Sequence, residues 1–452
     1  MTDATRIAAW LPQARWFAGK GAAKPRVTIG DEVSIPGTAV RLAMLDVTTA
    51  DSTDRYVAPL ARDADAPLEP GFAAWIVEAI EAGAAIAGHE GLFRGHSAAA
   101  VARGPGGVTR VSPLGGDASN TSLLVEHAGR ALAVKLLRRC RPGIQPEVEV
   151  GEFFARHAPW EGTPRFLGWL EYASASGGST AVATLHEFAV GCTTAWDHLV
   201  PLMAGGGLSG PGRDMILDIA CRLGRTTAEM HRALASRADI AAFAPEAATA
   251  ADRRHEAERM REHAARVFDL AAARQQTLPV AVAAALHDMV GRRDAVLAAL
   301  GGLAEIDSPA ARIRIHGDYH LGQVLVRLPS LEPLVIDFEG EPGRPLADRR
   351  RKTTALKDVA GMCRSFDYLL RHAARGGGPP HDAAHRHLLE THFLDAYRAV
   401  AHGHSWWPAD AAAAGAILAV YKLDKAVYEL AYELTNRPDW VEVPLGALMA
   451  SA

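Results

Sequence analysis

Two short stretches in the second half of the chain constrain its fold more than any other feature. The first is His316–His320 (HGDYH), which follows the β-like run Arg312–Ile315 and places Asp318 in a polar loop. The second carries Asp337 directly after the apolar strand Leu334–Ile336. A carboxylate beside a hydroxyl nucleophile, with an oxygen ligand and a second carboxylate for Mg²⁺, is what phosphoryl transfer from ATP requires. Together the two stretches predict a phosphotransferase.

Each polar residue of these stretches has an expected role. We expect Asp318 to orient the acceptor hydroxyl and accept its proton, while most of the catalysis comes from the placement of charge. His316 is expected to lock the loop through hydrogen bonds to the backbone. His320 either supports the loop or contacts the substrate. Glu339, two residues beyond Asp337 and on the same side of an extended strand, is a further candidate metal ligand.

An earlier Gly-rich segment offers donors for nucleotide phosphates. Gly115–Ser122 ends in the small polar residues Ser119, Asn120, Thr121 and Ser122. It has neither the GK[ST] ending of a Walker A loop nor the GxGxxG pattern of protein kinases. On its own the segment is typical of an ordinary hairpin turn, so its assignment as a phosphate loop depends on a cation in the neighbouring strand.

The next predicted strand, Arg130–Leu137, carries the cation that such a loop needs. Lys135 in this strand is the residue type that kinases use to hold phosphates, paired with a glutamate on a helix. Glu149 is the expected partner and Glu147 the alternative.

The adenine base should be bound one strand further along the chain. Glu187 and Ala189 follow the apolar strand Ala181–Leu185, where the adenine hinge is expected, and backbone groups would bind the base there.

The whole set of segments resembles the maltokinases of actinobacteria, which are ATP-dependent kinases that make maltose 1-phosphate for α-glucan synthesis. The likeness is carried by His316–Leu325, Val335–Arg350 (VIDFEGEPGRPLADRR) and Asp358–Phe366. Three more segments resemble parts of the family. Leu11–Gly21 resembles its N-terminal cap, and Ser119–Ser122 resembles its phosphate loop. Asp424–Glu429 and Asn436–Trp440 together resemble its C-terminal sugar-site helix.

The resemblance implies specific ligands for metal and sugar. Gln323, where related phosphotransferases usually have Asn, and Asp337 would bind Mg²⁺. Tyr319 is a departure, because maltokinases more often carry Leu there. On and just beyond the predicted helix Ile417–Asn436, the candidate sugar-binding residues are Lys425, Tyr428, Glu429, Glu433 and Arg437, with His320 from the HGDYH loop as a further candidate. The resemblance implies sugar contacts for Lys425 and Tyr428. Their three- and four-residue spacing also fits an ordinary row of solvated ion pairs.

The predicted fold is α+β, a bilobal protein-kinase-like (aminoglycoside phosphotransferase) fold with an additional N-terminal cap. We expect a cap domain at 1–90, a β-rich nucleotide-binding lobe at 91–191 and a mainly helical lobe at 192–452. The implied reaction converts ATP and maltose to ADP and maltose 1-phosphate with Mg²⁺. The alternatives are a kinase for another sugar, such as glucosamine or an aminoglycoside, and a catalytically silent binding regulator. Family analogy suggests trehalose synthase or a maltosyltransferase as a partner.

Composition and sequence pattern argue against a nucleic-acid-binding, membrane-spanning or secreted protein. The net charge is −4 and no basic patch is interleaved with aromatic residues, so nucleic acid is not an expected partner. No apolar run reaches the length of a bilayer span, and the first residues lack a signal-peptide pattern. The four cysteines are scattered, which is typical of reduced thiols, and we expect a cytoplasmic enzyme.

Overall fold

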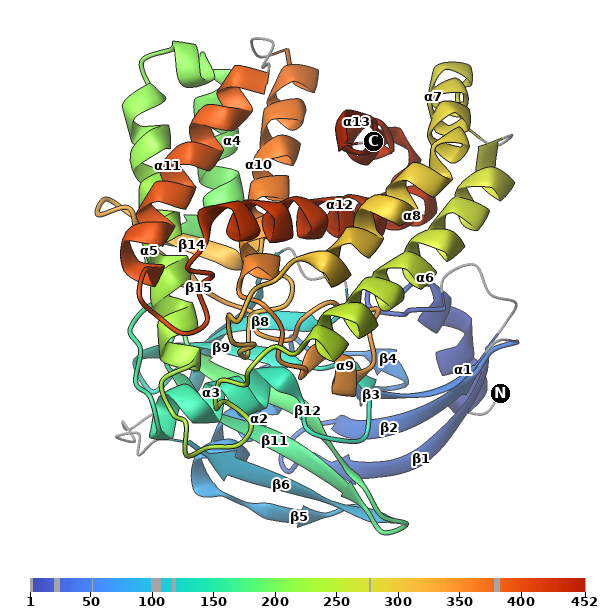
Figure 1. The fold of residues 1–452 in the computed structure, drawn as a ribbon. Helices are drawn as coiled ribbons and strands as arrows, with labels where there is room; N and C mark the ends of the chain where they lie inside the picture. The colour runs from blue at the N-terminus through green and yellow to red at the C-terminus, as the bar shows by residue number, and fades with distance from the viewer. Residues whose placement is uncertain are drawn as a thin grey trace. The chain divides into compact units, whose positions relative to one another are not determined.

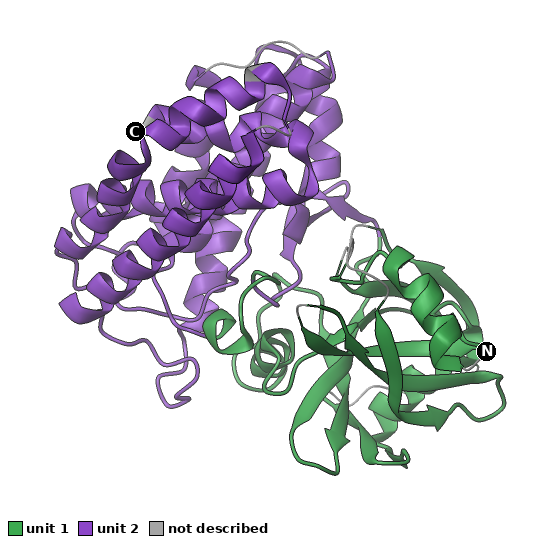
Figure 2. Ribbon diagram, turned by 90° about the vertical axis from the view of Figure 1, so that its right-hand side faces the viewer, with its two compact units in different colours: residues 1–190, 341–350 green, residues 191–340, 351–452 purple. Residues whose placement is uncertain are grey.

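The computed structural model divides the chain into two compact units (Figure 2). Unit 1 comprises Met1–Val190 and Glu341–Arg350, and unit 2 comprises Gly191–Gly340 and Arg351–Ala452. The structure describes residues 3–19, 25–50, 52–98, 107–115, 119–275, 278–377 and 383–451. Residues 116–118 of the predicted phosphate loop, and Lys20 and Gly21 of the cap motif, lie outside these ranges.

The N-terminal sheet of unit 1 is formed by β1 (Arg26–Ser34), β2 (Val40–Thr48) and β3 (Thr53–Ala61), which are antiparallel and drawn in blue in Figure 1. β4 (Ala64–Asp65) and β10 (Arg139–Cys140) both pair with β3. The sequence predicts β-like pieces at Val27–Ile35, Thr38–Val47 and Asp54–Pro59, and the three long strands match them to within a few residues.

Side chains of β2 are buried on both faces of this sheet. Ala43 and Leu45 pack with α1 (Asp3–Trp10) and the residues after it, whereas Leu42 and Met44 pack with α2 (Pro70–Ala82). The alternation follows from the two-residue period of a strand. Hydrophobic residues at consecutive positions therefore fill two separate cores.

Helix α2 is held between defined ends. Pro70 occupies its first turn, and Gly83 ends it in the left-handed conformation (φ 62°) with its N–H bonded to the carbonyls of Ala79 and Ile80. Gly95 lies against the same helix, because a Cβ there would collide with the Ala79 carbonyl. The sequence predicts a helix over Phe72–Ile86, and in the structure this helix ends earlier, at Ala82.

The second sheet of unit 1 has seven antiparallel strands and forms the lobe that carries Lys135. In their order across the sheet they are β5 (Ala85–Ala87), β6 (Gly91–Ser97), β11 (Phe166–Ser174), β12 (Ser179–Glu187), β9 (Arg130–Leu136), β8 (Thr121–His127) and β7 (Val108–Pro113). One buried cluster contains Leu42 and Met44 of the first sheet, Phe72 of α2, and Val125 and Leu170 of the second sheet. The two sheets of unit 1 therefore share a hydrophobic core.

Two short helices complete unit 1. α3 (Pro146–Arg156) packs on β11 through Val148 and Phe166. α9 (Leu346–Arg349) lies in the segment that returns to this unit late in the chain.

Unit 2 combines a small sheet with a helical body. Its antiparallel strands are β13 (Cys192–Thr194), β14 (Val324–Arg327) and β15 (Glu332–Val335). Its α-helices are α4 (Ala195–Ala204), α5 (Arg213–Leu234), α6 (Ala250–Arg274), α7 (Val280–Gly291), α8 (Arg293–Gly301), α10 (Leu356–Arg375), α11 (Ala383–Ala401), α12 (Ala411–Asn436) and α13 (Glu442–Ser451). α5 and α11 run side by side, and α12 crosses α10 (Figure 1).

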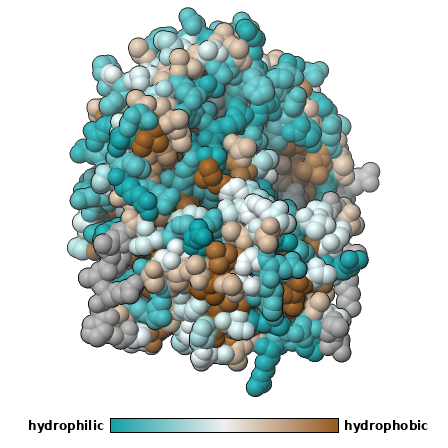
Figure 3. Space-filling model, turned by 90° about the horizontal axis from the view of Figure 1, so that it is seen from below, coloured by the Kyte–Doolittle hydropathy of each residue, from teal (hydrophilic) through white to brown (hydrophobic). Residues whose placement is uncertain are grey.

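The surface is mixed in character. On the face shown in Figure 3, hydrophobic residues form small, separate patches among hydrophilic ones. Among the described residues, no helix combines the length and the apolar character needed to cross a bilayer.

Candidate active site

The candidate catalytic loop lies between Ile313, which forms a β-bridge with Thr353, and β14, and its central carboxylate is paired with a lysine. Asp318 Oδ1 lies 3.0 Å from Nζ of Lys425 on α12, and their side chains are 19% and 16% exposed. The same Nζ lies 4.5 Å from the centre of the Tyr428 ring. Lys425, which the maltokinase resemblance assigns to the sugar, therefore lies at the candidate catalytic carboxylate, 107 residues away from it along the chain, and Tyr428 lies beside Lys425.

The buried carboxylate of Asp358 anchors this loop through hydrogen bonds to its backbone. Asp358 of α10 accepts hydrogen bonds from the backbone N–H groups of His316 (2.8 Å) and Gly317 (2.9 Å), and from Nε2 of His231 (3.0 Å). Burial raises the pKa of the Asp358 carboxyl, but the hydrogen bond from His231 and the nearby donors hold it below its ordinary value. The sequence motif contains Asp358 but gives no indication of this role.

His316 links the two stretches of the sequence motif. Its Nε2 donates to the Ile336 carbonyl at 2.9 Å, and its Nδ1 accepts from the Asp318 N–H at 3.3 Å. The prediction that His316 locks the loop through backbone hydrogen bonds is confirmed. Tyr319 is 1% exposed and bonded to the Thr227 hydroxyl, so the departure from the maltokinase pattern lies in the core.

His320 supports the turn after the loop. Its Nδ1 accepts from the Gly322 N–H at 3.0 Å, which caps the short 3₁₀ turn Leu321–Gln323. Burial lowers the pKa of the imidazole, with Lys425 acting in the same direction and Asp318 against it. A neutral ring with Nδ1 as acceptor leaves Nε2 as its N–H donor.

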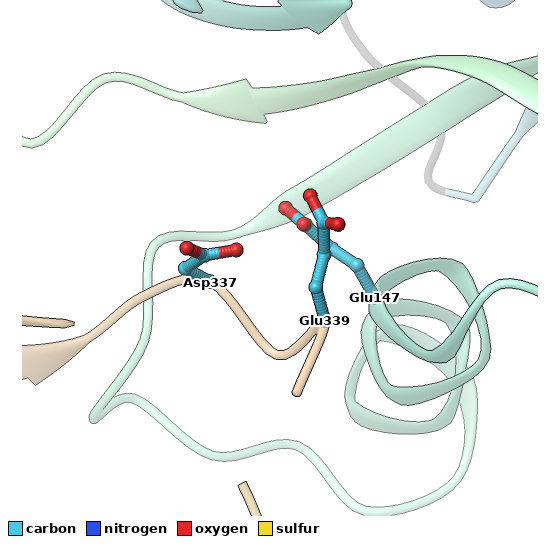
Figure 4. A group of neighbouring side chains, drawn as sticks. All are labelled: Glu147, Asp337 and Glu339. Carbon is cyan, nitrogen blue, oxygen red and sulfur yellow. The ribbon is translucent and has the colours of Figure 1, made fainter. Parts of the chain in front are cut away.

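The candidate metal ligands stand at the end of β15. Asp337 has a positive φ of 68°, a strained conformation for a residue other than glycine and one that clusters at functional sites. The Gln323 side chain donates to Asp337 Oδ2 at 2.8 Å, and Glu339 is 7% exposed. Figure 4 shows Asp337 and Glu339 rising from the segment after β15, and Glu147 leaving α3.

This donor set fits a hard cation. Carboxylate oxygens of Asp337 and Glu339 approach to within 4.8 Å, although two carboxylates at this distance repel each other. Their oxygens, with the amide oxygen of Gln323, are the ligand types that Mg²⁺ prefers.

The lysine of the nucleotide lobe pairs with a different glutamate from the one expected. Lys135 Nζ lies 2.8 Å from Glu147 Oε2, and both side chains are buried. Glu149 instead forms a two-contact ion pair with Arg350, at 2.7 and 2.9 Å. The assignment of Glu149 as partner is corrected to Glu147, which faces β9, whereas Glu149 faces the segment that carries α9.

The described part of the phosphate loop is tied to the strand that carries Lys135. Ser122 pairs with Lys135 and Thr121 with Leu136 across the β8–β9 hairpin. Asn120 accepts a hydrogen bond through Oδ1 from the Arg138 N–H at 3.3 Å. Ser119 lies at the start of this described part.

The expected hinge comes directly after β12. The Glu187 N–H donates to the Arg165 carbonyl, and its side chain is exposed beside Arg165. Ala189 is the residue before Val190, where the first segment of unit 1 ends.

The remaining predicted sugar ligands are engaged with other side chains. Glu429 accepts from Nε and Nη2 of Arg364 at 3.0 and 2.6 Å, and Arg364 also donates to Asp367. Burial raises the pKa of Glu429, while the Arg364 charge opposes the shift. This buried ion pair joins α12 to α10, and loss of one partner would be strongly destabilising.

One turn further along α12, Glu433 is 1% exposed and bonded to Arg437 at 2.9 and 2.5 Å and to the Tyr368 hydroxyl at 3.0 Å. Arg437 also lies over the rings of Tyr432 and Trp440. Glu429 and Glu433 are therefore placed in structural networks, whereas Lys425 contacts the candidate catalytic loop and Tyr428 lies beside Lys425.

Known proteins share this combination of segments. A family model described as the phosphotransferase enzyme family matches residues 110–366, more than half of the chain. The chain belongs to this phosphotransferase family. A second model, described as the maltokinase N-terminal cap domain, matches residues 10–86. The expected α+β kinase-like fold with an N-terminal cap is confirmed, and the phosphotransferase is an enzyme by family.

Two curated relatives of this phosphotransferase are named glucosamine kinase. One, from Streptacidiphilus jiangxiensis, is 30% identical over 434 residues and 91% of each chain. The other, from Mycolicibacterium smegmatis, is 29% identical over 347 residues, 75% of this chain and 78% of the relative. A solved structure of glucosamine kinase (crystal form B) matches with a TM-score of 0.67 at 24% identity, covering 100% of this chain and 99% of that one. The structural match supports the same fold.

Proposed function

We propose that this phosphotransferase transfers the terminal phosphoryl group of ATP to maltose and forms maltose 1-phosphate. The observation that carries the proposal is the pair of Asp318 and Lys425, since it joins the candidate base to the helix that the maltokinase resemblance assigns to the sugar. The maltokinase-type cap at residues 10–86 supports the same family of substrates.

Each part of the reaction has a candidate residue. Asp318 would orient the anomeric hydroxyl and accept its proton as the bond to phosphorus forms. Lys425 would hold the Asp318 carboxylate in place and donate to the sugar. Lys135, fixed by Glu147, would bind nucleotide phosphates.

Asp337, Glu339 and Gln323 would hold Mg²⁺, which would neutralise phosphate charge. These assignments rest on donor chemistry, on the distances within each unit and on the resemblance of the sequence motifs.

The second candidate acceptor is glucosamine, which is favoured by the names of the two curated relatives. Glucosamine carries an ammonium group, and a protein site for such a group usually offers a carboxylate. Here Asp318 is already paired with Lys425, and Glu429 and Glu433 are paired with Arg364 and Arg437.

A second cation about 4 Å from Lys425 would be repelled by about 4 kcal/mol at an effective dielectric constant near 20, but the Asp318 carboxylate paired with Lys425 offsets most of this repulsion. The relevant observation is that all three carboxylates, of Asp318, Glu429 and Glu433, already have a cationic partner. This charge balance supports a neutral sugar.

A substrate panel separates the alternatives. ADP release would be measured with maltose, glucose, glucosamine and kanamycin under the same ATP and Mg²⁺ concentrations. We expect the highest kcat/KM with maltose, together with loss of the reducing end of the sugar, because only phosphorylation of the anomeric hydroxyl removes it. A higher kcat/KM with glucosamine, or a product that still reduces, would refute the maltose assignment. Absence of ADP release with every sugar would indicate a silent regulator.

The product would be consumed by a glucan-elongating transferase. The family resemblance suggests that trehalose synthase or a maltosyltransferase is the partner that supplies maltose or uses maltose 1-phosphate.

A further inference from the structure

Arg138 is one of the two fully buried arginines among the protein's described residues, with 0% exposure. It lies between β9, which carries Lys135, and β10, which pairs with the N-terminal sheet. A guanidinium group keeps its charge at every accessible pH, so its burial is tolerated only where hydrogen-bonding and charged partners surround it. The partners of Arg138 therefore show which parts of the protein it connects.

One set of partners belongs to the N-terminal cap. Nη1 and Nη2 of Arg138 each lie 3.0 Å from a carboxylate oxygen of Asp65 on β4, a two-contact arrangement with fixed orientation. Nη1 also donates to the Val57 carbonyl of β3 at 3.4 Å. The guanidinium carbon lies 4.7 Å from the ring centre of Trp16, whose Nε1 donates to the same Asp65.

Trp16 belongs to the cap motif Leu11–Gly21, whose sequence indicates no chemical role. Its position over Arg138 gives that motif a function in packing and orientation.

The other set of partners belongs to the phosphate loop. Nε of Arg138 donates to the Thr121 hydroxyl at 2.9 Å, and its backbone N–H donates to Asn120 Oδ1 at 3.3 Å. The planar guanidinium group therefore holds Thr121 through one edge and Asp65 through another. Because the group is rigid, a displacement of Asp65 must be transmitted to Thr121 or break one of the two contacts.

The backbone reinforces this coupling. The Arg138 carbonyl accepts from the Val57 N–H at 2.9 Å, and Arg139 and Cys140 continue as a strand of the cap sheet. The chain thus passes directly from the strand of Lys135 into the cap sheet.

We propose that the cap is a positioning element for the nucleotide phosphates, and that Arg138 is the residue that transmits the position of Asp65 and Trp16 to Asn120 and Thr121. The inference rests on the proposed function, in which Thr121 and its neighbours bind phosphate. A cap that holds the loop in its binding conformation lowers the entropy lost when ATP binds, so its effect appears in ATP affinity.

Asp65→Asn is the test variant, because it keeps the size of the side chain and removes its charge on the cap side, away from the phosphate loop. Asp54→Asn is the matched control. Asp54 also joins the cap to the lobe, through Arg139 at 2.6 and 2.9 Å, but that pair has no contact with the phosphate loop in the described structure. Trp16→Phe keeps an aromatic ring and loses the hydrogen bond to Asp65, which gives a milder second variant.

The full-length protein would be compared for ATP binding by calorimetry and for KM of ATP and of the sugar. We expect Asp65→Asn to weaken ATP binding by about tenfold, Trp16→Phe to weaken it by a few-fold, and Asp54→Asn to leave it within about twofold. The KM of the sugar should stay within about twofold throughout. If Asp65→Asn unfolds the protein, Trp16→Phe decides the result.

Unchanged ATP binding in a folded Asp65→Asn or Trp16→Phe protein would overturn the proposal, as would equal losses in Asp65→Asn and Asp54→Asn. Lys135→Ala distinguishes this failure from failure of the proposed function. If Lys135→Ala weakens ATP binding and the cap variants do not, only the positioning role is wrong. If the wild-type protein binds no ATP, the proposed function itself is wrong.

Discussion

Replacing Lys425 with methionine removes the ammonium group that lies 3.0 Å from Asp318 Oδ1 and keeps most of the aliphatic side chain. Both side chains are less than one-fifth exposed, so the interaction is only partly screened by water. Because Lys425 contacts the candidate base, we expect Lys425→Met to reduce kcat as well as to raise the KM of the sugar. The packing of the stem of the side chain against Tyr428 should survive.

The size of the effect follows from the type of contact. A hydrogen bond to a charged group contributes about 1.5–3 kcal/mol. If that contribution is made in the transition state, kcat/KM for the sugar falls by about ten- to a hundredfold. The KM of ATP should change by less than about threefold, since the nucleotide phosphates are assigned to other residues.

Steady-state kinetics of purified variants would measure this effect. Lys422→Met is the control, because Lys422 lies about one turn earlier on α12 and pairs with Glu390 at 2.7 Å, away from the catalytic loop. It should retain kcat/KM within about twofold. A Lys425→Met enzyme with nearly unchanged kcat/KM for the sugar, or one whose ATP and sugar constants shift equally, would refute the reasoning.

Three further perturbations test the other assigned groups. Asp318→Asn should keep the fold and ATP binding but lower kcat by several orders of magnitude, and activity within about tenfold of wild type, roughly 1.4 kcal/mol of barrier, would exclude it as the base. EDTA should abolish activity and Mg²⁺ should restore it. Asp337→Ala should weaken ATP binding even in excess Mg²⁺. If neither EDTA nor Asp337→Ala changes the affinity for ATP, Asp337 has a structural role instead. Glu147→Gln should raise the KM of ATP more than Glu149→Gln, and the reverse order would restore Glu149 as the partner of Lys135.

The sequence alone does not identify which of Glu147 and Glu149 pairs with Lys135. Both residues lie in the first turn of α3, and at about 100° per residue they point to opposite sides of the helix. The spacing of apolar residues predicts the helix and the two acids on it but not its rotation about its axis. That rotation is set by packing between the helix and the sheet, where Val148 belongs to the buried cluster that contains Phe166 of β11.

The acids of α12 give a second example. The pair of Glu433 and Arg437 is four residues apart and is predictable from helical spacing. The partner of Glu429 is Arg364, 65 residues earlier, and no local pattern indicates it. The phosphotransferase family could be predicted because the polar residues of its motifs are concentrated in a few adjacent positions.

The start of one strand, β6, was predicted wrongly for a similar physical reason. The sequence predicts a connector around Gly88–Gly95, whereas in the structure β6 begins at Gly91. Glycine is unfavourable inside a strand, so Gly91 and Gly95 obscure the strand pattern. Both glycines are explained by close neighbours, Tyr172 in the first case and the backbone of α2 in the second. Where two distant segments approach closely, the sequence shows only the glycine and not the segment that lies against it.

The core shared by the two sheets of unit 1 sets a limit on how this enzyme can be shortened or recombined. A chain that began at residue 91 would lose Leu42, Met44 and Phe72, and would expose the faces of Val125 and Leu170 that they cover. Such a fragment would display a broad apolar surface and aggregate. The cap is thus inherited together with the sheet that carries Lys135, and exchange of parts between relatives should succeed only when residues 1–190 are exchanged together with Glu341–Arg350, the later segment of unit 1.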